Sequence, residues 1–385
     1  MSNRPTIGNL FLSFLRLGLT AFGGPAMVAY VKELSVHKKQ WLDEETFKNG
    51  IALCQSIPGA TVMQMAAYVG LVSRGIKGVL LTYIGFGLPA FILMMIFSAL
   101  YITSHNIPKV ISLFNGLQVI VVAIVAYATY TFAKGILKNY WNISTAILSA
   151  IFFWSGISPF VVIIGTALIG IVFFRNETSL LPSSHDRENK RSMFKNILLL
   201  FVILLAGFVG LYLIDKKLFE LAILMLKIDF FAFGGGFGSV PLMLHEIVNV
   251  RGWMDSKTFM DGIALGQVTP GPIVITATFV GYLVYGLLGA VVATISIFTP
   301  SFLILVVVTP FFNKLKTSAY FLKATKGILA SFVGLLFYTT VKFSLAVPWD
   351  IVRVLLVLAA FITLVKRMDV INIVLIGAAI SIFIF

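Results

Sequence analysis

The chain has 385 residues, of which 59% are hydrophobic and 11% are charged, whereas soluble globular proteins are about 45–50% apolar and about 25% charged. This composition, with a mean hydropathy of +1.00, excludes an ordinary soluble enzyme and indicates a protein of the lipid bilayer. The net charge of +14 would suggest a nucleic-acid partner in a soluble protein, but in a membrane protein it is first a signal of topology, so we expect no nucleic-acid binding.

Several apolar segments are long enough to cross a membrane. A helix needs about 17–25 residues to span the hydrocarbon layer, and uncharged runs of this length lie at residues 79–102, 110–133, 196–213, 289–312 and 327–345. Two pairs of shorter runs predict helical hairpins of thin or tilted spans, and they lie at 143–157 with 159–174 and at 351–365 with 370–385. The sequence therefore predicts an all-α polytopic membrane protein.

A polar, basic segment at residues 175–195 divides the chain nearly in half. We expect three parts: an N-terminal transporter repeat at 1–174, a charged cytoplasmic linker with a connecting transmembrane helix at 175–213, and a C-terminal repeat at 214–385. The apolar start of the chain carries Arg4 and Arg16 and lacks a small-residue cleavage site, so we expect no cleaved signal peptide.

The two halves are related in sequence. Ala-Phe-Gly-Gly occurs at 21–24 and again at 232–235, and Gly-Ile-Ala-Leu occurs at 50–53 and again at 262–265. The offsets of 211 and 212 residues continue through later glycines and prolines. Internal duplication of this kind is the architecture of many secondary transporters.

The distribution of Lys and Arg favours an inverted orientation of the second repeat. If residues 7–36 and 45–73 each form a re-entrant hairpin, most of the 29 basic residues fall on one side of the membrane, which the positive-inside rule makes cytoplasmic. A full crossing by residues 7–31 would divide the basic residues more evenly, and the sequence leaves that alternative open.

Each half contains two glycine or proline breaks inside apolar sequence. Unpaired backbone groups are tolerated there only against protein or a wet cavity, and broken helices at matching places in two halves indicate a transport site. The first break comprises Phe22, Gly23, Gly24 and Pro25, and its counterpart comprises Phe233, Gly234, Gly235 and Gly236. The half-helix after such a break offers free N–H groups to an anion; the alternative is that these are packing glycines.

The second break follows a duplicated glutamine. Its candidate residues are Gln55, Ser56, Pro58 and Gly59 in the first half and Gln267, Thr269, Pro270 and Gly271 in the second. Ser56 and Thr269 are predicted to cap the helix that starts at the following proline. The two glutamines are candidates for hydrogen bonds to substrate or between helices.

Few charges occur inside the apolar segments. Arg16 and its counterpart Lys227 are candidate ligands of a substrate anion, with snorkelling to the membrane surface as the alternative. Asp229, in the place of Gly18, is a candidate proton carrier or a local counter-ion. Acidic residues in the connecting loops are predicted to cap helices, and they are Asp43 and Asp255.

These motifs resemble the chromate ion transporter family, whose duplicated members carry Phe-Gly-Gly-Pro early in each half and Gln-x-x-Pro-Gly-Pro about thirty residues later. Residues 22–25 and 267–272 fit fully. Gly236 and Ala60 stand where the family pattern has proline, which suggests that the two halves are not equivalent in function. The resemblance implies chromate export through the plasma membrane, driven by the membrane potential or a proton gradient.

Chromate is an oxyanion similar to sulfate, so a transporter or channel for sulfate or another anion is the alternative. We expect the anion to bind between the four half-helix starts and one repeat to rock against the other. An intramembrane enzyme is a remote alternative, because Cys54 is the one candidate nucleophile and the four histidines lack metal-binding spacing. We expect neither a metal nor another cofactor, and the sequence leaves proton coupling and a homodimer open.

Overall fold

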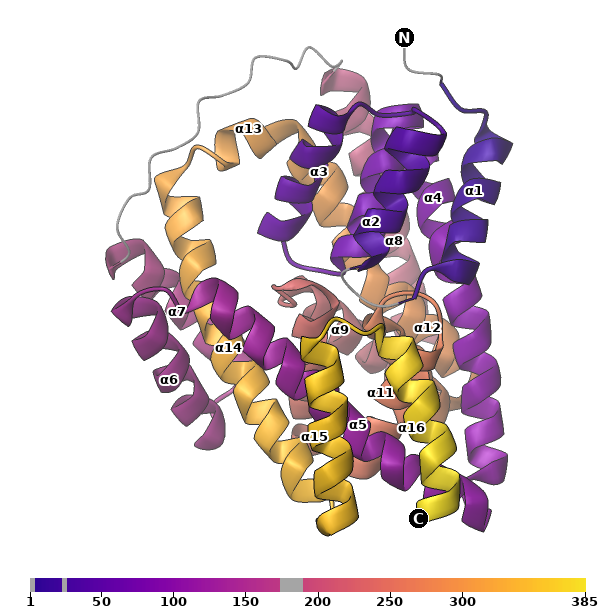
Figure 1. The fold of residues 1–385 in the computed structure, drawn as a ribbon. Coiled ribbons are helices and arrows are strands. Elements are labelled where there is room, and N and C mark those ends of the chain that lie inside the picture. The colour runs from indigo at the N-terminus through magenta and orange to yellow at the C-terminus, as the bar shows by residue number, and fades with distance from the viewer. Residues whose placement is uncertain (1–3, 23–25, 174–189) are drawn as a thin grey trace.

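The computed structural model describes residues 4–22, 26–173 and 190–385, and within these ranges every regular element is helical (Figure 1). The chain is thus the predicted all-α polytopic protein. Gly23, Gly24 and Pro25 lie outside the described residues, as does most of the predicted linker.

The first half forms eight helical elements. They are α1 (Ile7–Thr20), α2 (Ala26–Lys32), η1 (Glu33–Lys38), α3 (Glu44–Ser56), α4 (Thr61–Ser104), α5 (Pro108–Ile136), α6 (Tyr140–Trp154) and α7 (Pro159–Phe173).

The second half follows a connecting helix, α8 (Lys190–Ile214). Its elements are α9 (Lys216–Phe230), η2 (Gly235–Gly238), α10 (Ser239–Met243), η3 (Leu244–Val250), α11 (Ser256–Val268), η4 (Ile273–Ile275), α12 (Thr276–Val308), η5 (Thr309–Phe311), α13 (Phe312–Leu315), α14 (Ala319–Ala346), α15 (Ile351–Val365) and α16 (Val370–Ile384).

The long apolar runs of the sequence are helices in the structure. Within the described residues, four helical stretches are long and apolar enough to cross a membrane: Thr61–Ser104, Pro108–Ile136, Ile273–Leu315 and Ala319–Ala346. The run at 196–213 lies within α8, and the two pairs of shorter runs are the helix pairs α6 with α7 and α15 with α16. The predicted caps Asp43 and Asp255 are confirmed, because their carboxylates accept the N–H groups of Thr46 and Thr258 at 2.8 Å.

Helices α4 and α12 each fold back on themselves at a glycine. Gly75 has φ +61° and ψ −151°, and Gly286 has φ +63° and ψ −151°. A Cβ on Gly70 would collide with the carbonyl of Gly78, although eight residues of straight helix would separate the two by about 12 Å. The sharp reversal makes a hairpin of the segment after each proline break. It lies beyond the hairpin that the sequence predicts for residues 45–73, whose turn is at Pro58 and Gly59.

The packing of the helices follows the duplication. Helix α1 packs on α4 as α9 packs on α12, α4 packs on α12, and α5 packs on α14. Each peripheral hairpin lies against the long helix of the other half: α6 and α7 on α14, and α15 and α16 on α5. The two halves are therefore interlocked rather than separate bodies.

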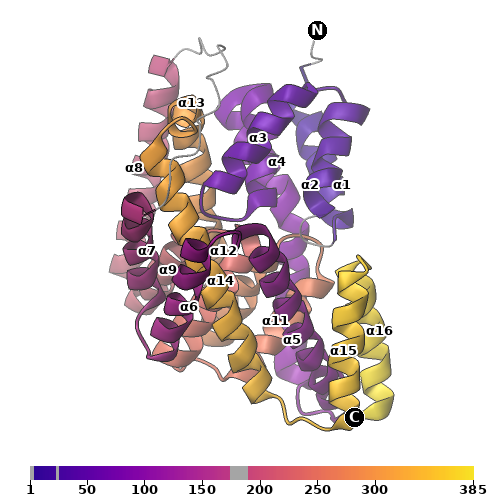
Figure 2. The ribbon, with the colours of Figure 1, turned by 60° about the vertical axis from the view of Figure 1, so that its left-hand side comes forward.

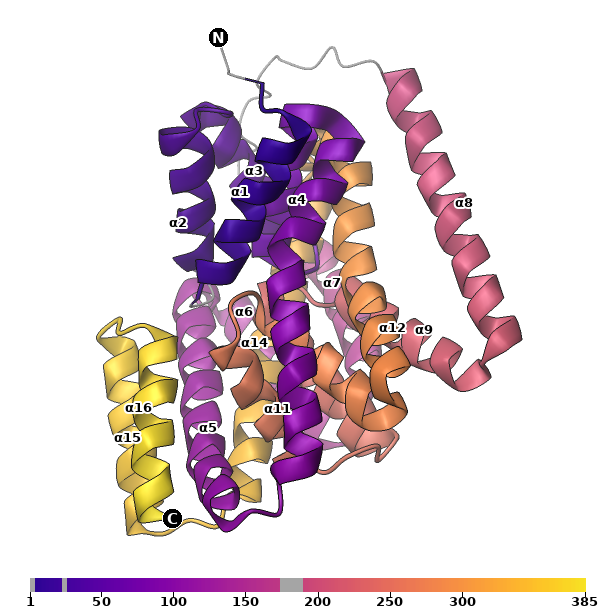
Figure 3. The same cartoon turned by 90° about the vertical axis from the view of Figure 1, so that its right-hand side faces the viewer.

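Corresponding connections of the two halves lie at opposite ends of the molecule. The turn between α4 and α5 lies at the end where the chain terminates, whereas α13 and the turn into α14 lie at the other end (Figures 1 and 3). Helix α8 stands beside this body and packs on α9 (Figure 3).

Candidate functional site

The proline breaks of each half hydrogen-bond to the glycine breaks of the other half. The N–H of Gly59 donates to the carbonyl of Ala232 at 2.8 Å, and the N–H of Gly271 donates to the carbonyl of Ala21 at 3.0 Å. Gly59 and Gly271 are equivalent in the duplication, and so are Ala21 and Ala232. The structure thus brings the breaks of both halves together through a reciprocal pair of backbone hydrogen bonds.

These two glycines have conformations that other residues rarely adopt. Their φ angles are +114° for Gly59 and +113° for Gly271, where a Cβ is strongly disfavoured. A Cβ on Gly59 would also collide with the Ser301 hydroxyl, and one on Gly271 would lie 3.0 Å from the Cβ of Ala90. Glycine is therefore required at both positions for the halves to approach so closely.

Asp229 lies fully buried beside this junction. Its Oδ2 accepts the Ser301 N–H at 2.8 Å and the Ser301 hydroxyl at 2.6 Å. The same hydroxyl accepts the N–H of Ala60, in the first half, at 3.0 Å. Within the described residues, Oδ1 of Asp229 is buried without a hydrogen-bond partner, so the carboxylate keeps free acceptor capacity inside the protein.

Equivalent positions of the other half have none of these polar groups. Gly18 stands for Asp229, Ala90 for Ser301, and Pro272, which has no N–H, for Ala60. The departure at Ala60 from the family pattern thus has a physical reason, because the N–H of Ala60 donates a hydrogen bond to the Ser301 hydroxyl, which a proline could not do. Sequence reasoning found Asp229 and noted the departure at Ala60 but missed Ser301, although the joint loss of all three groups in the other half was a readable signal.

Two glutamine side chains near the breaks, the buried Gln64 and the half-buried Gln267, each have a buried polar atom without a hydrogen-bond partner within the described residues. Nε2 of Gln64 donates to the carbonyl of Pro58 at 2.6 Å, and its Oε1 has no partner within the described residues. The predicted Gln267 has a buried Nε2 that is likewise unpaired there. Such a donor suits an oxyanion. Gln55, the counterpart of Gln267 in the first half, is exposed at the end of α3.

The predicted capping roles of Ser56 and Thr269 are wrong. The hydroxyl of Ser56 donates back to Ala52 within α3, and that of Thr269 donates to Gly266 within α11. Pro58 and Pro270 lie in the extended links after these helices. The next helical elements are α4, which begins at Thr61, and η4, which begins at Ile273 and leads directly into α12. The sequence places the helix starts too early, because proline is tolerated in an extended link as well as in a first helical turn.

The glycine break of the second half is irregular. Gly234 and Gly235 have φ of +84° and +78°, and Gly236 accepts the Ser239 hydroxyl through its carbonyl at 2.7 Å. Phe233 is half-buried, as is Phe22 in the first half. A Cβ on Gly235 would lie 3.0 Å from the Thr61 hydroxyl at the start of α4, so this break also adjoins a helix start of the other half.

The two candidate cations have different surroundings. Nζ of Lys227 lies 3.0 Å from Oε1 of the buried Glu246 and 3.7 Å from the centre of the Phe160 ring, and Arg251 pairs with the same carboxylate. The charge of Lys227 is therefore paired with a buried carboxylate, although the lysine side chain itself is 44% exposed. Glu246, which sequence reasoning missed, corresponds to Ser35 in the first half.

Arg16 lies on the exposed face of α1, between the exposed Leu12 and Leu19. Its equivalence to Lys227 in sequence does not extend to its partners, because the first half has a serine where the second has Glu246. Arg16 faces outward rather than toward the buried Asp229.

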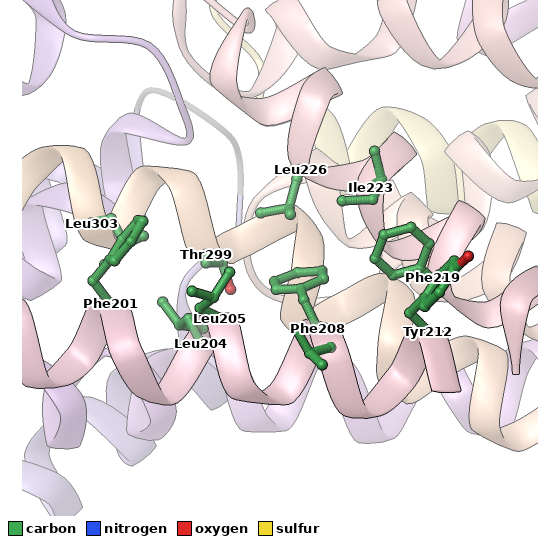
Figure 4. A pocket seen from close by; sticks show the side chains of 11 residues that line it. Phe201, Leu204, Leu205, Phe208, Tyr212, Phe219, Ile223, Leu226, Thr299 and Leu303 are labelled. Atoms are coloured by element: carbon green, nitrogen blue, oxygen red, sulfur yellow. The ribbon is translucent and has the colours of Figure 1, made fainter. Parts of the chain in front are cut away.

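Metal ligands do not mark another centre in the part of the chain that the structure describes. No cluster of His, Cys, Asp and Glu there could hold a metal ion. A cavity of about 410 Å³ lies between α8, α9 and α12, where Phe201, Phe208 and Leu226 are among the side chains that line it (Figure 4). Because its lining is almost entirely apolar, this cavity does not suit an anion.

The sequence matches one family twice. Residues 8–171 and 219–382 each match the family described as chromate transporter. The chain is 46% identical to an uncharacterized transporter of Methanocaldococcus jannaschii over 377 residues, which cover 97% of this chain and 94% of the relative.

Two relatives are named chromate transport proteins. The one from Cupriavidus metallidurans is 30% identical over 94% of this chain and 88% of its own length, and the one from Pseudomonas aeruginosa is 30% identical over 86% and 80%. No solved structure matches the chain.

Proposed function

The chain belongs to the chromate transporter family, and on that basis we propose that it is a secondary active transporter of an oxyanion that exports chromate across the cell membrane. Relatives named for chromate transport, aligned over most of both chains, support this substrate. Sulfate, an oxyanion of similar shape, is the competing substrate. We propose transport without enzymatic conversion of the anion.

We propose that the two halves, at 1–174 and 214–385, are inverted repeats joined by a cytoplasmic linker and a connecting transmembrane helix at 175–213. The opposite placement of the α4–α5 turn and the α13–α14 turn supports this arrangement (Figures 1 and 3). The concentration of Lys and Arg on one side of the inverted topology supports a cytoplasmic location for the N-terminal side.

The proposed anion site lies where the broken segments of both halves meet. The observation that carries it is the reciprocal bonding of Gly59 to Ala232 and of Gly271 to Ala21. Irregular backbone at membrane depth is tolerated where it lines a cavity or a binding site, and the start of α4 at Thr61 presents free N–H groups to an anion. In the second half the helical run begins with η4 at Ile273, and the N–H of Thr276 is already bonded within that turn. The unpaired Nε2 of Gln267 adds a side-chain donor.

The remaining candidates have supporting roles in this proposal. The links contribute backbone rather than side-chain ligands, and they comprise Phe22, Ser56, Pro58, Thr269, Pro270, Phe233, Gly234, Gly235 and Gly236. Arg16, which has no ion-pair partner among the described residues, supplies positive charge that attracts the anion from outside the junction, whereas the ion pair of Lys227 with Glu246 holds α9 in place.

We propose Asp229 as the proton-coupling residue. Because a carboxylate and a bound anion repel each other, protonation of Asp229 favours anion binding, so proton and anion move in the same direction. Each net negative charge then gains about 2.3 kcal/mol per 100 mV when it leaves a cell whose interior is negative. A dianion that carries one proton still moves outward with the membrane potential.

The test is uptake of chromate and of sulfate into inside-out vesicles. We expect Arg16→Gln to reduce the initial rate, Lys227→Gln to reduce the amount of folded protein, and Asp229→Asn to abolish the dependence of uptake on pH. Unchanged transport in both cation variants would contradict their proposed roles. Assay of the purified protein for chromate reduction tests the absence of enzymatic conversion.

A further inference from the structure

Most equivalent helices of the two halves pack in the same way, but α3 and α11, which are equivalent in the duplication, have different packing. Helix α11 packs against α4, α5, α14 and α16 in addition to its own partner α12. Its counterpart α3, within the described residues, packs extensively on α4 alone. The two helices lie toward opposite ends of the molecule (Figures 1 and 2). The hairpin that contains α11 is therefore closely packed at one end, whereas the hairpin that contains α3, the loose hairpin, is loosely packed at the other end.

The loose hairpin exposes a continuous face of α3. Lys48, Ala52 and Gln55 are all exposed, and their spacing of four and three residues places them on one side of the helix. Glu45, one turn earlier, is exposed as well. Because this face is rich in charged and amide groups, it suits water rather than lipid. It leads from the surface to the proline break at the proposed anion site.

The equivalent face of α11 is closed beyond its first turn, where Lys257, the counterpart of Glu45, is exposed. Met260 and Ala264 are 0% and 1% exposed, and Gln267 is half-buried. Ala52 and Ala264 occupy matching positions with the same side chain, so their difference in exposure reflects the packing of the two hairpins rather than their composition.

A buried carboxylate ties the closed hairpin to the other half. Oδ2 of Asp261 on α11 accepts the Tyr101 hydroxyl of α4 at 2.9 Å, and its Oδ1 accepts Nε2 of Gln118 on α5 at 2.8 Å. Asp261 and Gln118 are 6% and 5% exposed. The matching positions of the loose side carry no carboxylate, and they are Asn49, Phe312 and Leu329.

We infer that Asp261, held by Tyr101 and Gln118, is the latch that closes the α11 side of the transport path, and that this structure is the state open on the α3 side. This inference rests on the proposed transport function. In the opposite state α3 packs against the second half as α11 packs here against the first, and the latch is broken. Since the loose side has no equivalent carboxylate, the state closed at α11 is the resting one.

The test measures water access at the two matched alanines. Ala52→Cys and Ala264→Cys are made separately in a Cys54→Ser background, because Cys54 is the only native cysteine, and are treated with a membrane-impermeant thiol reagent without substrate. We expect rapid labelling of Ala52→Cys from the side of the N-terminal loops and protection of Ala264→Cys from either side.

Breaking the latch should reverse this pattern. Tyr101→Phe removes one hydroxyl donor and keeps the aromatic ring, and we expect it to raise the labelling rate of Ala264→Cys on the order of tenfold, as a lost bond to a carboxylate predicts. Gln118→Met is a second, similar-sized variant with the same expected effect. Tyr130→Phe, which alters an exposed tyrosine of α5, is the control and should leave the rate unchanged.

Equal labelling of the two cysteines in the parent protein would overturn the assignment of the open side. Unchanged protection of Ala264→Cys in both latch variants would overturn the role of Asp261. Both readings are taken without substrate, so a failure of chromate transport leaves them intact, and a failure of the latch leaves the transport assay intact.

Discussion

The Ser301 hydroxyl adds a side-chain link to the backbone hydrogen bonds that join the two halves. That hydroxyl donates to the buried Asp229 at 2.6 Å and accepts the Ala60 N–H at 3.0 Å. Ser301→Ala removes both bonds and adds no bulk, because alanine is smaller than serine. Alanine also occurs at the equivalent position of the other half, Ala90. The variant therefore isolates the energetic value of the hydroxyl.

The expected cost of Ser301→Ala is the sum of two losses. A hydrogen bond to a charged group is worth about 1.5–3 kcal/mol, and a buried N–H left unpaired costs about 1–3 kcal/mol. Asp229 keeps its bond from the Ser301 N–H at 2.8 Å, so the carboxylate retains one hydrogen bond. Together these losses predict a destabilisation of roughly 2.5–6 kcal/mol.

A second substitution separates the two losses. Ala60 has φ −73° and follows a glycine with φ +114°, almost the conformation of Pro272 after Gly271, so proline fits the backbone at this position. In the parent protein Ala60→Pro removes the donor to Ser301 and should destabilise the fold. In the Ser301→Ala background it removes an orphaned N–H and should restore about 1–3 kcal/mol.

The assay is thermal unfolding of the four purified proteins in detergent, read as a double-mutant cycle. The hydrogen bond between Ser301 and Ala60 requires the effect of Ala60→Pro on stability to change sign: the substitution destabilises the parent and stabilises the Ser301→Ala variant. Equal effects of Ala60→Pro in the two backgrounds would refute the hydrogen bond between Ser301 and Ala60 and, with it, this part of the junction.

Three further predictions concern stability. Glu246→Gln removes the buried carboxylate that pairs with the part-exposed Lys227 and Arg251 and should destabilise the protein by about 1.5–3 kcal/mol in thermal unfolding; a loss below about 0.5 kcal/mol would contradict the pairing. Gly281→Ala drives a Cβ into the backbone of the folded-back α12 and should lower the yield of folded protein, whereas Gly135→Ala, in open space on α5, should be neutral or stabilising by up to about 1 kcal/mol. Hydrogen bonds from the N–H and hydroxyl of Thr46 lower the pKa of Asp43, so its stabilising contribution is present above the ordinary aspartate pKa of about 3.9 and is lost as the pH falls through the lowered value. The difference in melting temperature between the parent and Asp43→Ala should therefore shrink as the pH falls below about 4, and a constant difference would contradict the capping role.

The duplication made much of the fold predictable. Repeated glycines and prolines located the interruptions in each half, and the uncharged runs located the long helices, because both signals are local in sequence. The reversal after each proline break was also within reach, since Gly75 and Gly286 recur at the same offset and adopt the same positive φ. The starts of α4 and α12 were placed too early, because a proline does not by itself distinguish an extended link from a first helical turn.

The partners of the site residues were not predictable in the same way. Asp229 and Ser301 are 72 residues apart, and Lys227 and Glu246 are 19 apart, so no helical spacing links them. Comparison of the two halves could have singled out Asp229, Ser301 and Glu246, because their counterparts are Gly18, Ala90 and Ser35, whereas Lys227 has a basic counterpart in Arg16. The difference in packing between α3 and α11 is a property of one conformational state, which sequence similarity between the hairpins conceals.

Transport of an oxyanion by this protein is tested most directly by flux into proteoliposomes that contain the purified chain alone. Chromate is placed at equal concentration on both sides, and a membrane potential and a pH gradient are imposed separately. The account predicts that chromate accumulates above its starting concentration on the side made positive by the potential, and that Asp229→Asn loses the response to the pH gradient. Potential-driven accumulation that is equally large for unrelated small anions would indicate a channel, and an absence of chromate flux under both gradients would contradict the proposed function.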